Sequence, residues 1–340
     1  MDKEYFLSLR TQYENLGDFL IAQATVNLLS QSGNLTLDIR DVPSDYLALF
    51  KLPENVRKVK AGFAGHVLKN RDKNWCYVVK PGGYSVANSS KDTVKLLLMG
   101  VYFRLLKAIA SVKVTKMPHS LFGKVCWADK FYSNSFDTVF CRDKLTLDNY
   151  KKAEIQNILL APDMAMFFVH EPSIFKADLN EIKDSVAISL RYDRLSDEVD
   201  SAQALASKIC SEQNLLRVSF ISQVMFDDEL NTKTAQLMNA SLLNYTLDSQ
   251  SIKSISTEYA RSKYVISNRL HSLLLGVING AIPIAVIDPQ KDQKIIGCLE
   301  DLGIEWFPKD QLKNLDVSTK SLSQENVDNR IISFKKALQY

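Results

Sequence analysis

Residues 263–280 read KYVISNRLHSLLLGVING and contain one complete strand-to-helix unit. The apolar run 264–266 predicts a buried strand, and the leucine-rich run that ends at Asn279-Gly280 predicts an apolar helix. Residues 267–271 follow the strand and open the helix. A parallel sheet is built by repeating such units, because each strand needs a crossover helix before the next parallel strand.

The same alternation of short apolar runs and longer helical patterns continues in both directions. Further strands are predicted at 5–8, 35–39, 75–79, 112–116, 138–141, 157–160, 186–190, 216–221 and 282–287. Helices are predicted at 18–30, 94–110, 198–211, 228–239, 251–261, 270–279 and 293–302. We therefore expect an α/β fold made of doubly wound, Rossmann-like sheets.

The length of 340 residues predicts two domains, because a single core stops growing at about 250–300 residues. We place an N-terminal domain at 1–175 and a C-terminal domain at 176–320. Residues 321–340 are expected to form a helix that packs back on the first domain. The two halves show no sequence repeat.

The composition excludes several classes of function. A net charge of +3, from 42 basic and 39 acidic residues, argues against an overall charge suited to binding nucleic acid or an anionic membrane. The five cysteines are widely spaced, without a zinc or disulfide pattern, and the N-terminus lacks the pattern of a signal peptide, so we expect a cytoplasmic protein. The apolar stretch 93–112 contains three basic residues, which favours a helix on a sheet face over a membrane span; contact with a membrane surface is the alternative.

Three candidate loops lie in the first half of the chain. Asn15, Gly17 and Asp18 precede an apolar helix, where glycine allows close approach and Asp18 is a cap or a base. Gly82 and Gly83 follow an apolar strand and predict a tight turn. This turn either binds a sugar or a phosphate or is an ordinary connection between a strand and a helix.

The third loop, which contains His119 and Ser120, is assigned to a strand end, where loops line active clefts.

Asp163 follows Pro162, and its carboxylate is either a turn acceptor or a catalytic acid or base. Arg191 comes after the first strand of the second half. It either clamps an anion or pairs with an acid such as Asp193.

The unit 263–280 itself contains the strongest local signal. Ser267 or Asn268 is predicted to cap the helix, with Arg269 and His271 in its first turn. A cation in that position opposes the helix dipole, so Arg269 predicts a bound anion. Histidine is suited to proton transfer near neutral pH, which makes His271 a catalytic candidate. Lys291 follows the next strand and either faces the same site or is solvated.

Taken in order, these motifs resemble the polysaccharide pyruvyl transferase family over residues 13–291. The resemblance rests on Asn-x-Gly-Asp at 15–18, Gly82-Gly83, Pro118-His119-Ser120, Arg142-Asp143, Ala-Pro-Asp-Met at 161–164, Arg191, and Ser-x-Arg-Leu-His at 267–271. Two positions depart from the family pattern: Tyr84 stands where a third glycine is usual, and His119 where glutamine is usual. Both departures bear on which acceptor is bound rather than on the fold.

The resemblance implies two domains facing a cleft, as in GT-B glycosyltransferases, with phosphoenolpyruvate as donor and no cofactor or metal. The acceptor would be a glycan of a cell-surface polysaccharide, which is either lipid-linked or free, and the site would lie in the cytoplasm or at the inner face of the membrane. The domain at 1–175 would take the acceptor and the domain at 176–320 phosphoenolpyruvate. Arg269 and Arg191 would bind the donor. His271 would act as general acid or as a partner of the phosphate, and Asp18 or Asp163 as base. The remaining residues predicted to bind substrate are Asn15, Gly17, Gly82, Gly83, His119, Ser120, Ser267 and Lys291. A glycosyltransferase that uses a nucleotide sugar and a non-catalytic glycan-binding protein remain as alternatives.

Overall fold

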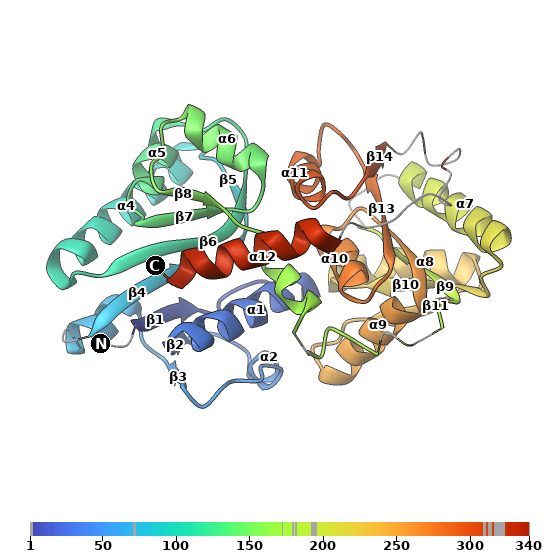
Figure 1. Ribbon diagram of the computed structural model, residues 1–340, viewed down its shortest axis with the longest axis horizontal. Coiled ribbons are helices and arrows are strands. Elements are labelled where there is room, and N and C mark those ends of the chain that lie inside the picture. Colours follow the sequence, from blue (N-terminus) through green and yellow to red (C-terminus); the bar gives the residue numbers. More distant parts are fainter. Residues whose placement is uncertain are drawn as a thin grey trace. The chain divides into compact units, whose positions relative to one another are not determined.

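In the computed structural model, the chain divides into two compact units. Unit 1 comprises Met1–Thr11, Ile21–Met164 and Asp328–Tyr340, and unit 2 comprises Gln12–Leu20 and Ala165–Val327. The structure describes residues 3–70, 73–171, 173–178, 180, 182–191, 196–308, 311, 315 and 324–339. Both units contain a parallel sheet with helices, so the predicted α/β fold is confirmed (Figure 1).

Unit 1 contains a parallel sheet in the order β3-β2-β1-β4-β6-β7-β8, with β5 also paired to β6. Its strands are β1 (Lys3–Ser8), β2 (Asn34–Asp38), β3 (Val56–Val59), β4 (Asn74–Val79), β5 (Gly82–Ser85), β6 (Lys113–Phe122), β7 (Thr138–Cys141) and β8 (Ile158–Leu160). The order runs outward from β1 and β4 in opposite directions. Right-handed crossovers therefore place the connecting helices on both faces of the sheet.

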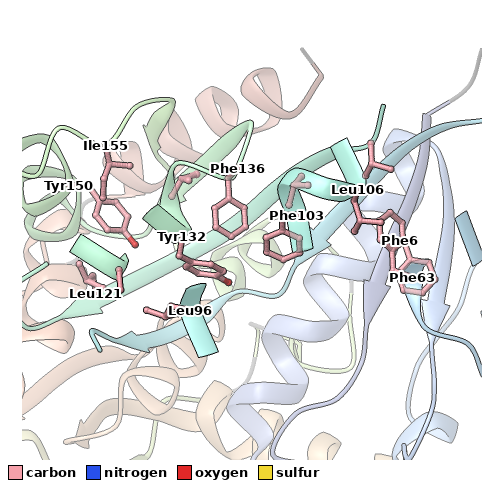
Figure 2. Packing of buried hydrophobic residues seen from close by; sticks show 14 of the residues in the cluster. Phe6, Phe63, Leu96, Phe103, Leu106, Leu121, Tyr132, Phe136, Tyr150 and Ile155 are labelled. Atoms are coloured by element: carbon pink, nitrogen blue, oxygen red, sulfur yellow. The ribbon is translucent and has the colours of Figure 1, made fainter. Parts of the chain in front are cut away.

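The helices of unit 1 are α1 (Leu16–Ser32), α2 (Ser44–Ala48), α3 (Phe63–Lys69), α4 (Ser90–Ala110), α5 (Trp127–Ser133) and α6 (Lys144–Lys152). A buried cluster lies between the sheet and α3, α4 and α5, and Figure 2 shows it from close by. Phe103 of α4 contacts the rings of Tyr77, Tyr132 and Phe136, with ring centroids 5.4–6.1 Å apart. Burial of each such side chain contributes about 1.5–3 kcal/mol, so this cluster fixes the helices on the sheet.

Two predictions about unit 1 are wrong in the same place. Residues 117–120 were assigned to a loop, but β6 continues to Phe122, with an irregular register between Lys116 and His119. Residues 82 and 83 were assigned to a turn, but they form β5, which pairs with β6 in register Gly82 to His119. Only Lys80 and Pro81 separate β5 from β4, and Gly82 begins β5 with a φ of +127° that other residues rarely adopt.

Unit 2 contains a second parallel sheet, in the order β11-β10-β9-β12-β13-β14. Its strands are β9 (Ser185–Ser189), β10 (Arg217–Ser222), β11 (Ser241–Asn244), β12 (Ser262–Ser267), β13 (Ile282–Ile287) and β14 (Trp306–Pro308). Its helices are α7 (Ser196–Gln213), α8 (Asp228–Leu237), α9 (Ser249–Arg261), α10 (Leu270–Ile278) and α11 (Gln293–Asp301), with short 3₁₀ helices η1 (Met164–Val169) and η2 (Met225–Asp227). The order reverses between β9 and β12, where ligands of such sheets bind.

The unit boundaries differ from the sequence-based domains at two points. The segment Gln12–Leu20, expected in the N-terminal domain, belongs to unit 2. The long central stretch of unit 1 ends at Met164, whereas the N-terminal domain was expected to end at residue 175. The C-terminal helix α12 (Gln324–Gln339) lies mostly in unit 1, where the ring of Phe334 packs edge-on against Phe140 at 4.8 Å. A cleft between the two domains stays a prediction. Across the described residues, we find no helix with the length and apolar character needed to cross a membrane.

Candidate functional site

The reversal point of the unit 2 sheet brings two arginines to neighbouring strand ends. Ser189 at the end of β9 pairs in register with Ser267 at the end of β12. Arg191 and Arg269 each follow their paired serine by two residues. Because adjacent strands are about 4.8 Å apart, both arginines leave the sheet at the same edge.

Side-chain hydrogen bonds fix the two strand ends to each other. The Arg191 backbone N–H donates to Asn268 Oδ1 at 3.0 Å, and the Ser267 hydroxyl donates to the Ser189 carbonyl at 2.5 Å. Ser272 on α10 donates to the Ser189 hydroxyl at 2.9 Å. Ser267 and Asn268 are fully buried, so they position the loops here, and substrate binding by Ser267 stays a prediction.

Arg269 differs from its predicted placement. Arg269, rather than Ser267 or Asn268, is the N-cap residue of α10, so it lies before the first turn and not within it. The predicted anion is supplied, in part, by the protein itself: Asp227 Oδ2 lies 2.5 Å from Arg269 Nε. Asp227 is buried on η2, whereas the Arg269 side chain keeps 20% of its surface exposed. The ion pair therefore orients a guanidinium that still reaches solvent.

His271 lies against the backbone of Gly17. A Cβ atom built on Gly17 would stand 2.3 Å from His271 Nδ1 and 2.8 Å from His271 Cβ. No side chain larger than hydrogen fits there without moving the imidazole. The sequence predicted glycine at position 17 for close approach of a ligand, and the structure shows that the group in close approach is His271.

The turn before α1 belongs to the same site. The Leu16 N–H donates to the Gln223 carbonyl at 2.9 Å, and Asn15 forms an antiparallel bridge with Val224. Within the turn, Asn15 Oδ1 accepts the Gly17 N–H at 2.9 Å, and Asp18 accepts the Gln12 N–H at 3.3 Å. These contacts explain why the segment Gln12–Leu20 belongs to unit 2.

Lys291 stands apart from this cluster. Its side chain is 60% exposed, and its ammonium lies 3.5 Å from Asp288 Oδ2 in the loop after β13. The structure thus places it in a solvated loop, and a substrate-binding role stays a prediction. Asp193, the rival partner of Arg191, lies outside the described residues.

In unit 1, several motif residues meet in one buried network. Arg142 pairs with Asp163 at 2.7 Å and donates from Nε to the Ser120 hydroxyl at 2.9 Å. Ser120 donates to Asp143, which also caps α6 by accepting the Thr146 N–H at 2.7 Å. The network fastens the ends of β6, β7 and β8 together. Catalysis by Asp163 and substrate binding by Ser120 stay predictions.

His119 is buried beside this network. Its Nδ1 lies 2.9 Å from the Phe140 carbonyl and must donate, so Nε2 accepts the Tyr150 hydroxyl at 2.8 Å. Burial, reinforced by the nearby charge of Lys116, lowers the pKa of His119 well below its ordinary value. The side chain is a neutral imidazole with both nitrogens engaged by protein groups. Substrate binding by His119 stays a prediction.

Eight of the thirteen predicted site residues thus lie in unit 2, and Gly82, Gly83, His119, Ser120 and Asp163 lie in unit 1. Sequence reasoning missed Asp227, although it follows the apolar strand β10 as the other candidates follow theirs. No group of three or more histidine, cysteine or acidic residues suited to a metal occurs among the described residues. Unit 2 therefore brings two arginines to adjacent strand ends, with a histidine on the helix that follows, and anion binding by these residues stays a prediction.

Two units of this kind define the GT-B-like class of α/β proteins, and solved structures show the same fold. UDP-GlcNAc 2-epimerase from Neisseria meningitidis superposes with a TM-score of 0.56 at 10% identity, covering 100% of this chain and 92% of that one. The Methanocaldococcus jannaschii enzyme gives 0.53 at 11% identity, covering 99% and 100%. At this identity the likeness concerns the fold alone. No curated protein matches the chain significantly.

The chain belongs to the polysaccharide pyruvyl transferase family, whose model matches residues 15–288. The match begins at Asn15 and includes the loop that contains Arg269 and His271. It identifies the protein as a transferase and supports a polysaccharide acceptor.

Proposed function

We propose that this protein transfers the enolpyruvyl group of phosphoenolpyruvate to two hydroxyls of a sugar in a cell-surface polysaccharide precursor, forming a pyruvate ketal. The donor methylene carbon gains a proton and becomes a methyl group. Both sugar oxygens bond to the central carbon, whose bond to the phosphate oxygen breaks. Of the two hydroxyl protons, one balances the new methyl group and one leaves with phosphate.

The arginine pair at the reversal point is the observation that carries this proposal. Phosphoenolpyruvate contains a phosphate and a carboxylate, and both groups suit the forked donors of arginine. Arg191 and Arg269 leave the sheet from adjacent strand ends that Asn268 joins. Asp227 contacts the Nε edge of Arg269, so a bound anion would meet its Nη groups.

His271 is the candidate general acid for the methylene carbon. It lies in the first turn of α10, two residues after Arg269, and Gly17 leaves the space that its ring occupies. A proton donor needs a fixed position relative to the carbon that it protonates. The contact with Gly17 provides that position.

The base that activates the acceptor is assigned to Asp18 rather than Asp163. Asp18 is half-buried in the turn that also holds Gly17, whereas Asp163 is buried and paired with Arg142. A carboxylate held in a buried ion pair is poorly placed to accept a proton from a sugar. The cytoplasmic location and the absence of a cofactor belong to the same proposal.

Thermal unfolding with phosphoenolpyruvate, a UDP-sugar or buffer alone tests the donor. A ligand at 100 times its dissociation constant stabilises a protein by about 2.7 kcal/mol, which is measurable as a shift in Tm. We expect a shift with phosphoenolpyruvate that Arg269→Ala removes and that Arg57→Ala, an exposed arginine on β3, retains. A shift with the UDP-sugar alone would replace this proposal with a glycosyltransferase, for which the fold is the present support.

A further inference from the structure

Helix α4 has a large apolar face that points away from the core. Its outer face, as we call it, consists of Val94, Leu98, Val101, Leu105 and Ile109, which are 54%, 67%, 45%, 54% and 60% exposed. These residues recur every three or four positions and so share one side of the helix. The opposite side is also apolar. It packs into the buried cluster through Leu96, Phe103 and Leu106, all labelled in Figure 2.

The two helices that contact α4 also carry exposed apolar side chains. Helices α3 and α5 both contact α4. Helix α3 adds Leu68, which is 46% exposed, and α5 begins with Trp127, which is 65% exposed. An apolar surface of this extent on a folded unit marks an interaction site.

The charges around this surface are mostly positive. Among the described residues of α3, α4 and the loop 123–126, the exposed charged side chains are Lys69, Lys91, Asp92, Lys95 and Lys124. The single acid among them, Asp92, accepts the Ser89 hydroxyl at 2.6 Å and lies at the helix N-terminus. The partner of this surface must therefore be both apolar and anionic.

The same asymmetry extends over the whole unit. Unit 1 contains 26 basic and 15 acidic residues, whereas unit 2 contains 16 basic and 24 acidic residues. The small net charge of the chain thus conceals a basic unit joined to an acidic one. A basic unit is attracted to an anionic surface over several ångströms.

We propose that the outer face of α4, together with Leu68 and Trp127, docks on the surface of an anionic phospholipid bilayer, with the helix lying in the interface. Apolar side chains, a tryptophan and flanking lysines are the combination that such interfacial helices use. A second copy of this chain fits less well. A stable interface uses about 20–30 residues a side. A two-fold contact would also place lysine-bordered faces against each other.

Flotation of the purified full-length protein with vesicles tests this inference. The vesicles contain phosphatidylcholine alone or phosphatidylcholine mixed with phosphatidylglycerol. We expect binding to the mixed vesicles that rises as salt is lowered, and that weakens roughly tenfold or more in a Leu98→Gln/Leu105→Gln variant. The matched control is Leu216→Gln/Leu237→Gln, which replaces two leucines of unit 2 that are 81% and 84% exposed. It should bind as the wild type does.

Three results would overturn the inference: no binding of the wild type to mixed vesicles, equal loss in the control variant, or a wild-type dimer that only the α4 variant dissociates.

A Lys91→Gln/Lys95→Gln variant should weaken binding to mixed vesicles and leave any binding to neutral vesicles unchanged. Undiminished binding of this variant to mixed vesicles would contradict the part played by charge. Neither phosphoenolpyruvate nor a glycan enters the assay, so its result is independent of the proposed reaction.

Discussion

The imidazole of His271 occupies the space that a side chain at Gly17 would need. A Cβ atom there would stand 2.3 Å from Nδ1, although the two residues are far apart in the sequence. The match between glycine and histidine links two motifs that sequence analysis treated separately.

Gly17→Ala should therefore impair turnover as strongly as loss of the histidine does. We expect a fall of about 10²-fold for both Gly17→Ala and His271→Ala, the usual size of a general acid contribution. Phosphate release from phosphoenolpyruvate in the presence of acceptor measures it. Gly65→Ala is the control, because a Cβ there meets nothing within 4 Å. Full activity in Gly17→Ala would show that the contact does not fix the imidazole, and full activity in His271→Ala would remove His271 from the mechanism.

The carboxylate of Asp227 is expected to orient Arg269 for the donor. Asp227→Asn retains the shape of the side chain but loses the charged contact with Arg269 Nε. The kcat/KM for phosphoenolpyruvate should therefore fall about tenfold, equivalent to about 1.4 kcal/mol. The neighbouring Glu229→Gln variant, which alters an exposed residue, should leave kcat/KM unchanged. An Asp227→Asn enzyme with wild-type kinetics would show that Arg269 needs no partner.

The buried pair Arg142–Asp163 is expected to contribute to stability. Asp163→Asn leaves the guanidinium without its charge partner and should lower the free energy of unfolding by about 3–5 kcal/mol. Urea unfolding measures the change. Glu154→Gln, which breaks the exposed pair with Lys130, should leave the midpoint unchanged. If Asp163→Asn instead loses turnover at unchanged stability, Asp163 is the catalytic base after all.

Lys116 should make the stability of unit 1 depend on pH. Burial lowers the pKa of Lys116 to about 7, whereas an unfolded lysine titrates near 10.5. Between these values the unfolded chain binds more protons, so stability rises with pH. The useful window is pH 7 to 9, because burial raises the pKa of Cys76 to about 11 and that of Cys141 to about 12, which reverses the trend above pH 9.

We expect the wild type to gain about 2 kcal/mol of unfolding free energy between pH 7 and pH 9. Lys116→Met should be more stable than the wild type at pH 7 and should lack this gain. Urea unfolding at the two pH values, followed by a probe in unit 1, measures both quantities. The same rise in the variant would mean that another group titrates in this range.

The amino-acid sequence by itself determined the fold class and the positions of the central elements. Strands buried on both faces appear as continuous apolar runs, so β7 and β13 have the bounds that the sequence predicted. Helix α10 begins at the predicted residue for a similar reason, since its apolar run is uninterrupted. Local periodicity records burial along one element, and these elements are buried throughout.

Tertiary structure alone decided which elements and residues come together. The edge strand β3, Val-Arg-Lys-Val, has too few apolar residues to be recognised and becomes a strand only by pairing with β2. The sheet of unit 2 has the same strand order as β3-β2-β1-β4-β6-β7 of unit 1 without any repeat in sequence, because order depends on crossover direction rather than on side chains. Gly17 meets His271, and Asp227 meets Arg269, through contacts between distant segments. Such contacts leave no periodic signal along the chain, and so the structure was needed to find them.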